Sequence, residues 1–151
     1  MPTLEWTGKD KVINHHQEVP FRVLERKYSF DEKGQHEEVN GFEYDMVMAL
    51  TAMPNVRWWH RNISRQGFCI NGFVKHYPDF IVETQSGKTI LIETKGDHLE
   101  NTETKYKLEL GRAWQNMAGS SFRYYMVFQS KDLNLHGAIQ FDKFCELMKN
   151  L

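Results

Sequence analysis

The sequence predicts one α/β domain in which helices flank a mixed β-sheet. Two observations support this fold class: strand-length apolar runs alternate with segments of helical periodicity, and one helical segment separates two strongly apolar runs. The chain has 151 residues, of which 40% are hydrophobic and 26% are charged. That length and composition suit a single globular core rather than two domains or a disordered chain.

The N-terminal part divides into an extension and the start of the domain. Residues 1–36 form the extension, with one expected strand from Glu18 to Tyr28, where apolar and charged residues alternate. The domain covers residues 37–151. Its first helix is expected to begin after Asn40 as N-cap, with Glu43 completing a capping-box start, and to run until Pro54 stops it.

The remaining elements follow from local pattern. Strands are expected at Val56–His60, Phe73–Thr84, Lys88–Thr94 and Phe122–Phe128, and helices at about Thr102–Ala118 and Gln140–Lys149. The helix at 102–118 links the strands at 88–94 and 122–128. Such a helical crossover makes those two strands parallel and their connection right-handed.

Three ionisable side chains interrupt two apolar strands. Asp79 precedes Phe-Ile-Val, whereas Glu93 and Lys95 follow Ile-Leu-Ile. Burying such charges costs several kcal/mol unless a partner compensates, and a divalent cation is the natural partner for two carboxylates. Glu93 and Lys95 are two residues apart and therefore share one face of their strand, while Thr94 points to the other face.

The loop between the strands decides where Asp79 lies. A three-residue loop, Gln85-Ser86-Gly87, places Gly87 at the left-handed position that such loops favour and sets Asp79 opposite Glu93. A two-residue loop would set Asp79 opposite Thr94, with the carboxylates on different faces. The glycine favours the first register.

These residue types suit metal-dependent phosphodiester hydrolysis. Carboxylates, a backbone carbonyl and water are the ligands that Mg²⁺ prefers, and Mn²⁺ can substitute for it. The metal activates water and polarises a phosphodiester. On the same face, Lys95 could orient that water or offset charge on the phosphate.

The pattern Pro78-Asp79 followed by Glu93-Thr94-Lys95 resembles the PD-(D/E)xK signature of restriction-endonuclease-like nucleases. More specifically, residues 40 to 128 resemble the nuclease domain of type III restriction subunits. The resemblance includes, in order, Asn40-Gly41-Phe42-Glu43, Val56 with Trp59-His60-Arg61-Asn62, Tyr77-Pro78-Asp79-Phe80, Glu93-Thr94-Lys95-Gly96, and Lys107-Leu108-Glu109-Leu110-Gly111-Arg112-Ala113-Trp114.

The resemblance implies a fold, an activity and roles for single residues. It implies a restriction-endonuclease-like sheet and an endonuclease that cuts DNA with Mg²⁺. The metal ligands would be Asp79, Glu93 and the carbonyl of Thr94, with Lys95 catalytic and Glu43 completing the site. The ATPase motor of the family is missing, since Gly87-Lys88-Thr89 lacks the first glycine of a Walker A loop.

Contacts to DNA are expected from basic residues near the site. One group clusters in sequence around the entry to the site and comprises Arg57, Arg61, Arg65, Lys75 and His76. A second group lies on the following helix and comprises Lys105, Lys107 and Arg112. The formal net charge is only -1. DNA affinity would then depend on a tethered helicase or ATPase domain or subunit, or equally on a homodimer.

Other readings remain open. Asp79 and Glu93 could be solvated or ion-paired strand-end charges, Glu43 could serve only as a capping residue, and the chain could be a DNA-binding module that does not cut, or a repair or junction-resolving nuclease. No apolar run approaches the roughly 18 to 20 residues that cross a bilayer. The N-terminus lacks a signal-peptide pattern, so the expected compartment is the cytoplasm.

Overall fold

The structure, a computed structural model, describes residues 41–62, 64–65, 67–72, 74–96, 102–130 and 135–151. The strand expected at Glu18–Tyr28, the Asn40 cap and the boundary of the N-terminal extension lie outside these residues. The helices within them are α2 (Gly41–Ala52), α3 (Thr102–Ala118) and α4 (Phe141–Met148). The strands are β1 (Val56–Arg61), β2 (Ile70–Asn71), β3 (Lys75–His76), β4 (Phe80–Thr84), β5 (Thr89–Lys95), β6 (Phe122–Phe128) and β7 (Ala138–Gln140).

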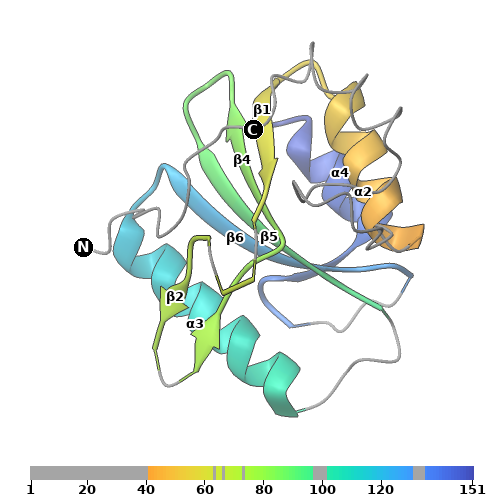
Figure 1. Ribbon diagram of the computed structural model, residues 1–151. Coiled ribbons are helices and arrows are strands. Elements are labelled where there is room, and N and C mark those ends of the chain that lie inside the picture. Colours follow the sequence, from red (N-terminus) through yellow and green to blue (C-terminus); the bar gives the residue numbers. More distant parts are fainter. Residues whose placement is uncertain (1–40, 63, 66, 73, 97–101, 131–134) are drawn as a thin grey trace.

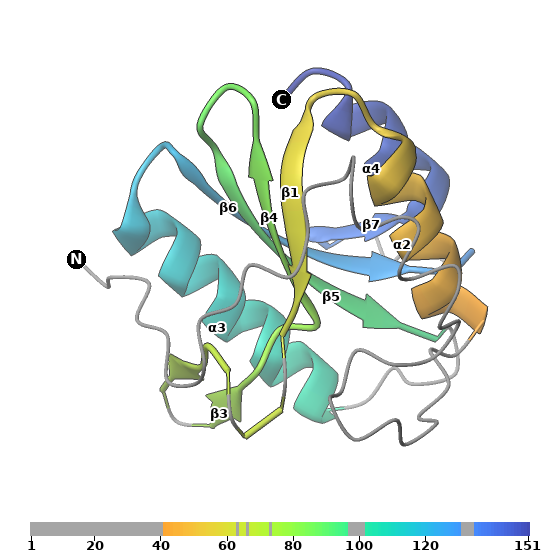
Figure 2. The same ribbon diagram turned by 45° about the horizontal axis from the view of Figure 1, so that its top comes forward.

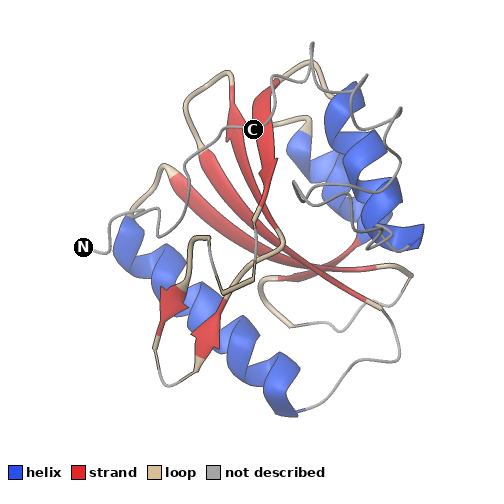
Figure 3. Ribbon diagram, viewed as in Figure 1, coloured by secondary structure: helices blue, strands red, loops and turns tan. Residues whose placement is uncertain are grey.

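Five of these strands form one mixed sheet in the order β1-β4-β5-β6-β7. The β1–β4 and β4–β5 pairs are antiparallel, whereas β5–β6 and β6–β7 are parallel. The predicted parallel pairing across the helical crossover is therefore confirmed. β2 and β3 form a separate two-stranded hairpin (Figure 3).

Helices cover both faces of the sheet, with α3 on one side and α2 and α4 on the other (Figures 1 and 2). Alternation along the strands divides the core accordingly. Val82 and Ile92 pack with α2 and α4, whereas Ile81, Leu91 and Tyr124 pack with α3. These apolar side chains are almost fully buried. The expected α/β class, a mixed sheet flanked by helices, is present.

The hairpin between β4 and β5 has the predicted three-residue loop. The N–H of Thr84 donates to the carbonyl of Lys88 at 2.9 Å, and Gly87 adopts a left-handed φ of 87°. Pairing then runs from Glu83 opposite Thr89 to Phe80 opposite Ile92. This is the predicted register, and the predicted pairing of Asp79 with Glu93 lies one step beyond the last paired residues.

Two expectations about the strands were wrong. The segment expected as one strand at Phe73–Thr84 is divided into β3 and β4 by the residues around Pro78. Proline lacks the N–H that a continuous ladder needs, and β3 pairs with β2 instead of entering the sheet. The short strands β2 and β7 were not predicted, because two or three residues give too little pattern.

The predicted helix at 102–118 is confirmed as α3, with Gly119 following it at a φ of 110°. The helix predicted at about 140–149 is α4, where the Gln140 side chain caps the N-terminus by accepting from two backbone N–H groups. No helix among the described residues is long and apolar enough to traverse a bilayer.

Gly87 and Gly41 provide a test of the loop that sets the register. A Cβ at either position meets no atom within 4 Å, but only Gly87 has a positive φ. Gly87→Ala should lower the free energy of unfolding by about 1 to 2 kcal/mol through backbone strain. Gly41→Ala should be neutral or slightly stabilising, because alanine favours a helix. Urea denaturation of both variants measures this; equal effects would contradict the assigned loop conformation.

Candidate active site

The three charged side chains singled out in the sequence lie together near the C-terminal end of β5, the central strand of the sheet. Glu93 shares its strand face with Leu91, which packs against α3. The same alternation places Lys95 on the α3 side, and Asp79, the residue just before β4, lies close enough for its charge to act on Glu93. The lysine Nζ lies 3.5 Å from Oε2 of Glu93. Two carboxylates and one ammonium therefore meet between the sheet and α3.

Asp79 is fixed by hydrogen bonds from the end of β5. Its Oδ2 accepts from the backbone N–H of Thr94 at 2.8 Å and from the Thr94 hydroxyl at 2.7 Å. Its own carbonyl accepts from the N–H of Asn62 at 2.8 Å. The Thr94 side chain was expected on the opposite face, yet it reaches Asp79 because β4 starts only at Phe80. Both donors use the same carboxylate oxygen, Oδ2.

The Glu93 carboxyl is buried, with 5% of the residue exposed. Burial first, and then the charge of Asp79, raise the pKa of Glu93 well above its usual range, while Lys95 and Lys107 act in the opposite direction. Among the described residues, no donor reaches Oε1 of Glu93. A buried carboxylate oxygen without a donor is unfavourable, and a cation would satisfy it.

Lys107 brings a second ammonium group to this face from α3. It acts on the pKa values of both Glu93 and His76, and it also pairs with Glu103 one helical turn earlier at 3.3 Å. About a fifth of its side chain is exposed. Of the basic helix residues expected near the site, Lys107 is the one that the structure places beside the carboxylates. Lys105 is exposed on the same helix.

Glu43 lies with α2, which covers the face of the sheet opposite α3. Its Oε2 is 3.3 Å from the guanidinium of Arg61, an expected DNA contact at the end of β1. Both side chains are largely buried in this ion pair. The structure thus gives Glu43 a defined partner outside the Asp79–Glu93 cluster, and a metal-binding role for it remains a prediction.

The other basic residues do not converge on the cluster. Arg57 lies near the far end of β1 and is 3.9 Å from Glu83, whereas the Arg61 end of the strand faces the site. Arg65 and Lys75 are exposed in and beside the β2–β3 region. His76 was expected in a phosphate-binding patch, and this is wrong. It is fully buried, and burial lowers its pKa to about 3, so it is neutral.

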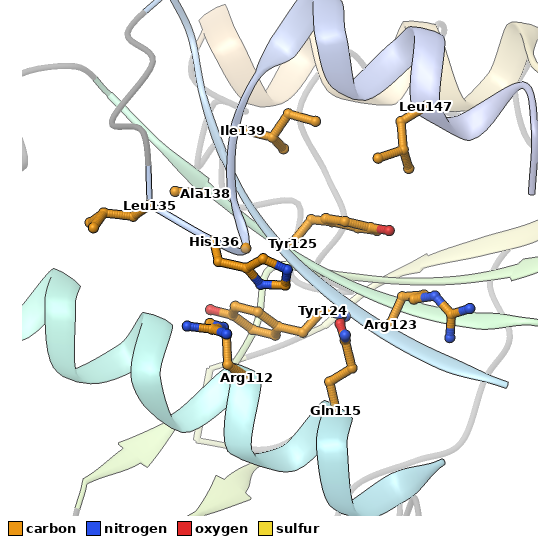
Figure 4. Close-up of a pocket in the computed structure, with 11 residues that line it drawn as sticks. Arg112, Gln115, Arg123, Tyr124, Tyr125, Leu135, His136, Ala138, Ile139 and Leu147 are labelled. Atoms are coloured by element: carbon orange, nitrogen blue, oxygen red, sulfur yellow. Dashed lines mark hydrogen bonds between the residues drawn. The ribbon is translucent and has the colours of Figure 1, made fainter. Parts of the chain in front are cut away.

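Arg112 lines a cavity of about 360 Å³ at the edge of the sheet. It rises with Gln115 from α3 on one side of β6, while Tyr125, Ile139 and Leu147 lie on the other (Figure 4). Neither Asp79 nor Glu93 lines this cavity. Asp79, Thr94 and Lys95, near the C-terminal end of β5, are partly exposed.

The donor set is compatible with Mg²⁺ or Mn²⁺. Within the described residues, no three His, Cys, Asp or Glu side chains gather closely enough to form an all-protein cage. Mg²⁺ is commonly held by one or two carboxylates and keeps waters or substrate phosphates as its other ligands. Asp79, Glu93 and the Thr94 carbonyl would supply that kind of partial shell, and the unsatisfied Oε1 of Glu93 fits it.

The contact between His76 and Tyr124 was missed from the sequence. Nε2 of His76 lies 2.6 Å from the Tyr124 hydroxyl, near enough to the carboxylates for the charges of Glu93 and Asp79 to act on Tyr124. Two signals pointed to it. A tyrosine in a nearly all-apolar buried strand needs a polar partner, and Gly111 in the middle of a helix indicates close packing. The partner itself is not local in sequence.

No family model, curated protein or solved structure matches the chain.

The raised pKa of Glu93 gives a pH-dependent test of the cluster. A group whose pKa is raised by folding contributes stability at low pH, and this is lost as pH rises above its ordinary value of 4.5. Glu93→Gln removes the ionisation. In EDTA, the variant should therefore gain stability over the wild type as pH rises, by up to about 1.4 kcal/mol per pH unit. Urea denaturation between pH 5 and 8 measures this. Parallel curves of unfolding free energy against pH for the two proteins would contradict a raised pKa of Glu93.

Proposed function

We propose that this chain is a metal-dependent DNA endonuclease domain with a restriction-endonuclease-like fold, similar to the nuclease domain of type III restriction subunits. The main observation behind this proposal is that the carboxyl groups of Asp79 and Glu93 lie close together, with Nζ of Lys95 3.5 Å from Oε2 of Glu93. The fold supports the proposal, because the sheet order and the helical crossover bring the signature residues to one edge.

Each residue then has a chemical task. Asp79 and Glu93 bind the cation with the Thr94 carbonyl, and the two Thr94 donors hold Asp79 in place. When bound there, Mg²⁺ polarises a phosphodiester and makes hydroxide available near neutral pH. Lys95 faces the same space, where its ammonium orients the attacking water or offsets negative charge on the phosphate.

DNA binding relies on local rather than overall charge. The net charge of -1 gives no general attraction to a polyanion. Lys95 and Lys107 form a positive rim around the carboxylates, and they would contact the phosphates next to the cleaved bond. Such a small rim fits a domain that is delivered to DNA by a helicase or ATPase partner, or that works as a homodimer.

Asp79→Asn tests the proposal without removing the structural role of Asp79. Asparagine keeps an acceptor oxygen for the two Thr94 donors but lacks the charge that holds a cation. Cleavage of plasmid and oligonucleotide DNA in Mg²⁺ or Mn²⁺ should fall by about two orders of magnitude, a scale typical of losing one electrostatic group from an active site. EDTA should abolish cleavage by the wild type, and Lys95→Ala should reduce it similarly.

Glu83→Gln is the matched control. Glu83 is an acidic residue of β4, the strand that follows Asp79, but it pairs with Arg57 and lies opposite Thr89, away from the cluster. This variant should cleave as the wild type does. Undiminished cleavage by Asp79→Asn would refute the site assignment. DNA binding by the wild type without cleavage in any metal would favour a non-catalytic module, and preference for branched or damaged substrates would favour a repair or junction-resolving nuclease.

A further inference from the structure

A buried polar pair lies near the carboxylate cluster. His76 of β3 and Tyr124 of β6 are almost fully buried, and their rings meet edge-on with centroids 5.6 Å apart. The His76 Nε2 lies 2.6 Å from the Tyr124 hydroxyl. This bond joins the small β2–β3 hairpin to the central sheet. His76 is also only three residues before Asp79 in the chain.

Helix α3 fixes Tyr124 at both its backbone and its ring. The backbone N–H of Tyr124 donates to Oε1 of Gln115 at 2.7 Å. The ring fills the space above Gly111, where an added Cβ would lie 2.4 Å from Cε1 of the tyrosine. The hydroxyl position is therefore set by the same helix that carries Lys107. His76 receives a fixed partner.

Charge excludes an ionic role for the pair. Burial first, and then Lys107 and Lys95, lower the pKa of His76 to about 3. Burial, and then Glu93 and Asp79, raise the pKa of Tyr124 well above its usual range. Both groups are thus neutral near pH 7, and both lie close enough to the charged groups of the site for these charges to shift their pKa values. What the pair supplies there is position rather than charge.

Burying this polar pair in the core also carries a desolvation penalty. Nδ1 of His76 is buried and has no hydrogen-bond partner among the described residues. Two apolar side chains would avoid this desolvation penalty. A buried hydrogen bond kept in spite of it restricts the geometry of the segments that it joins.

We propose that Tyr124 is a positioning residue of the site, whose hydroxyl holds His76 and, through Tyr77-Pro78, keeps Asp79 in contact with Thr94 and beside Glu93. This inference builds on the proposed function, since it gives the site a support that tunes its cation affinity. It concerns the placement of Asp79, however, and that placement can be measured without metal or DNA.

Tyr124→Phe is the test, because it removes one hydroxyl and leaves the ring against Gly111. The Thr94 amide donates to Asp79 and therefore reports its position. In metal-free protein, amide hydrogen exchange of Thr94 should accelerate by about tenfold, roughly the factor for losing one net hydrogen bond. The amides of Ile90 to Ile92, within the β5 ladder, should exchange as before. His76→Gln, which loses the imidazole, should give the same local pattern.

Tyr125→Phe is the matched control. Tyr125 is the next residue, but its ring packs against Phe144 on the opposite face of the sheet. This variant should leave Thr94 exchange unchanged. Unchanged Thr94 exchange in Tyr124→Phe would overturn the proposal. An equal acceleration of all β5 amides would also overturn it, because that pattern marks general destabilisation.

A second readout separates this inference from the proposed function. If the wild type binds Mn²⁺ in calorimetry, Tyr124→Phe should weaken binding by about tenfold or more, as changes behind metal ligands commonly do, and Tyr125→Phe should not. Unweakened Mn²⁺ binding by Tyr124→Phe would overturn the proposal. If the wild type binds no Mn²⁺, the nuclease assignment fails, and Thr94 exchange still decides whether Tyr124 positions Asp79.

Discussion

The buried contact between Glu93 and Asp79 is the constraint on which the site depends. Burial first, and then the charge of Asp79, disfavour ionisation of Glu93. The surrounding groups compensate for the contact. Lys95 pairs with Glu93, Lys107 approaches from α3, and Thr94 donates twice to Asp79. Among the residues that the structure describes, no hydrogen-bond donor reaches Oε1 of Glu93, and a bound cation would satisfy that oxygen.

A few local features of the backbone bring these two carboxyl groups together. The left-handed Gly87 fixes a loop of three residues, and that loop fixes which residue lies opposite Glu93. The parallel crossover then lays α3 over the same face and brings Lys107 to the carboxylates. Gly111 lets this helix approach the Tyr124 ring closely. Backbone geometry, rather than any single strong interaction, therefore sets the position of the charges.

Much of this arrangement could be predicted from the sequence because it follows from local periodicity. Strand alternation puts Glu93 and Lys95 on one face, and the Gly87 loop gave the correct register. Contacts between distant segments could not be predicted in this way. The pairing of Glu43 with Arg61, the position of Arg57 far from the site, and the burial of His76 against Tyr124 depend on how layers pack. The division of the strand around Pro78 was foreseeable, since proline cannot continue a central ladder.

The most direct test is a crystal structure of the protein grown with Mn²⁺ at neutral pH, with anomalous data to locate the metal. We predict one Mn²⁺ ion between the carboxylates of Asp79 and Glu93, next to the Thr94 carbonyl, and no such ion in crystals of Asp79→Asn. A structure in which the two carboxyl groups remain in contact, with no metal between them at saturating Mn²⁺, would contradict it. The cluster would then be a structural feature at the C-terminal end of β5.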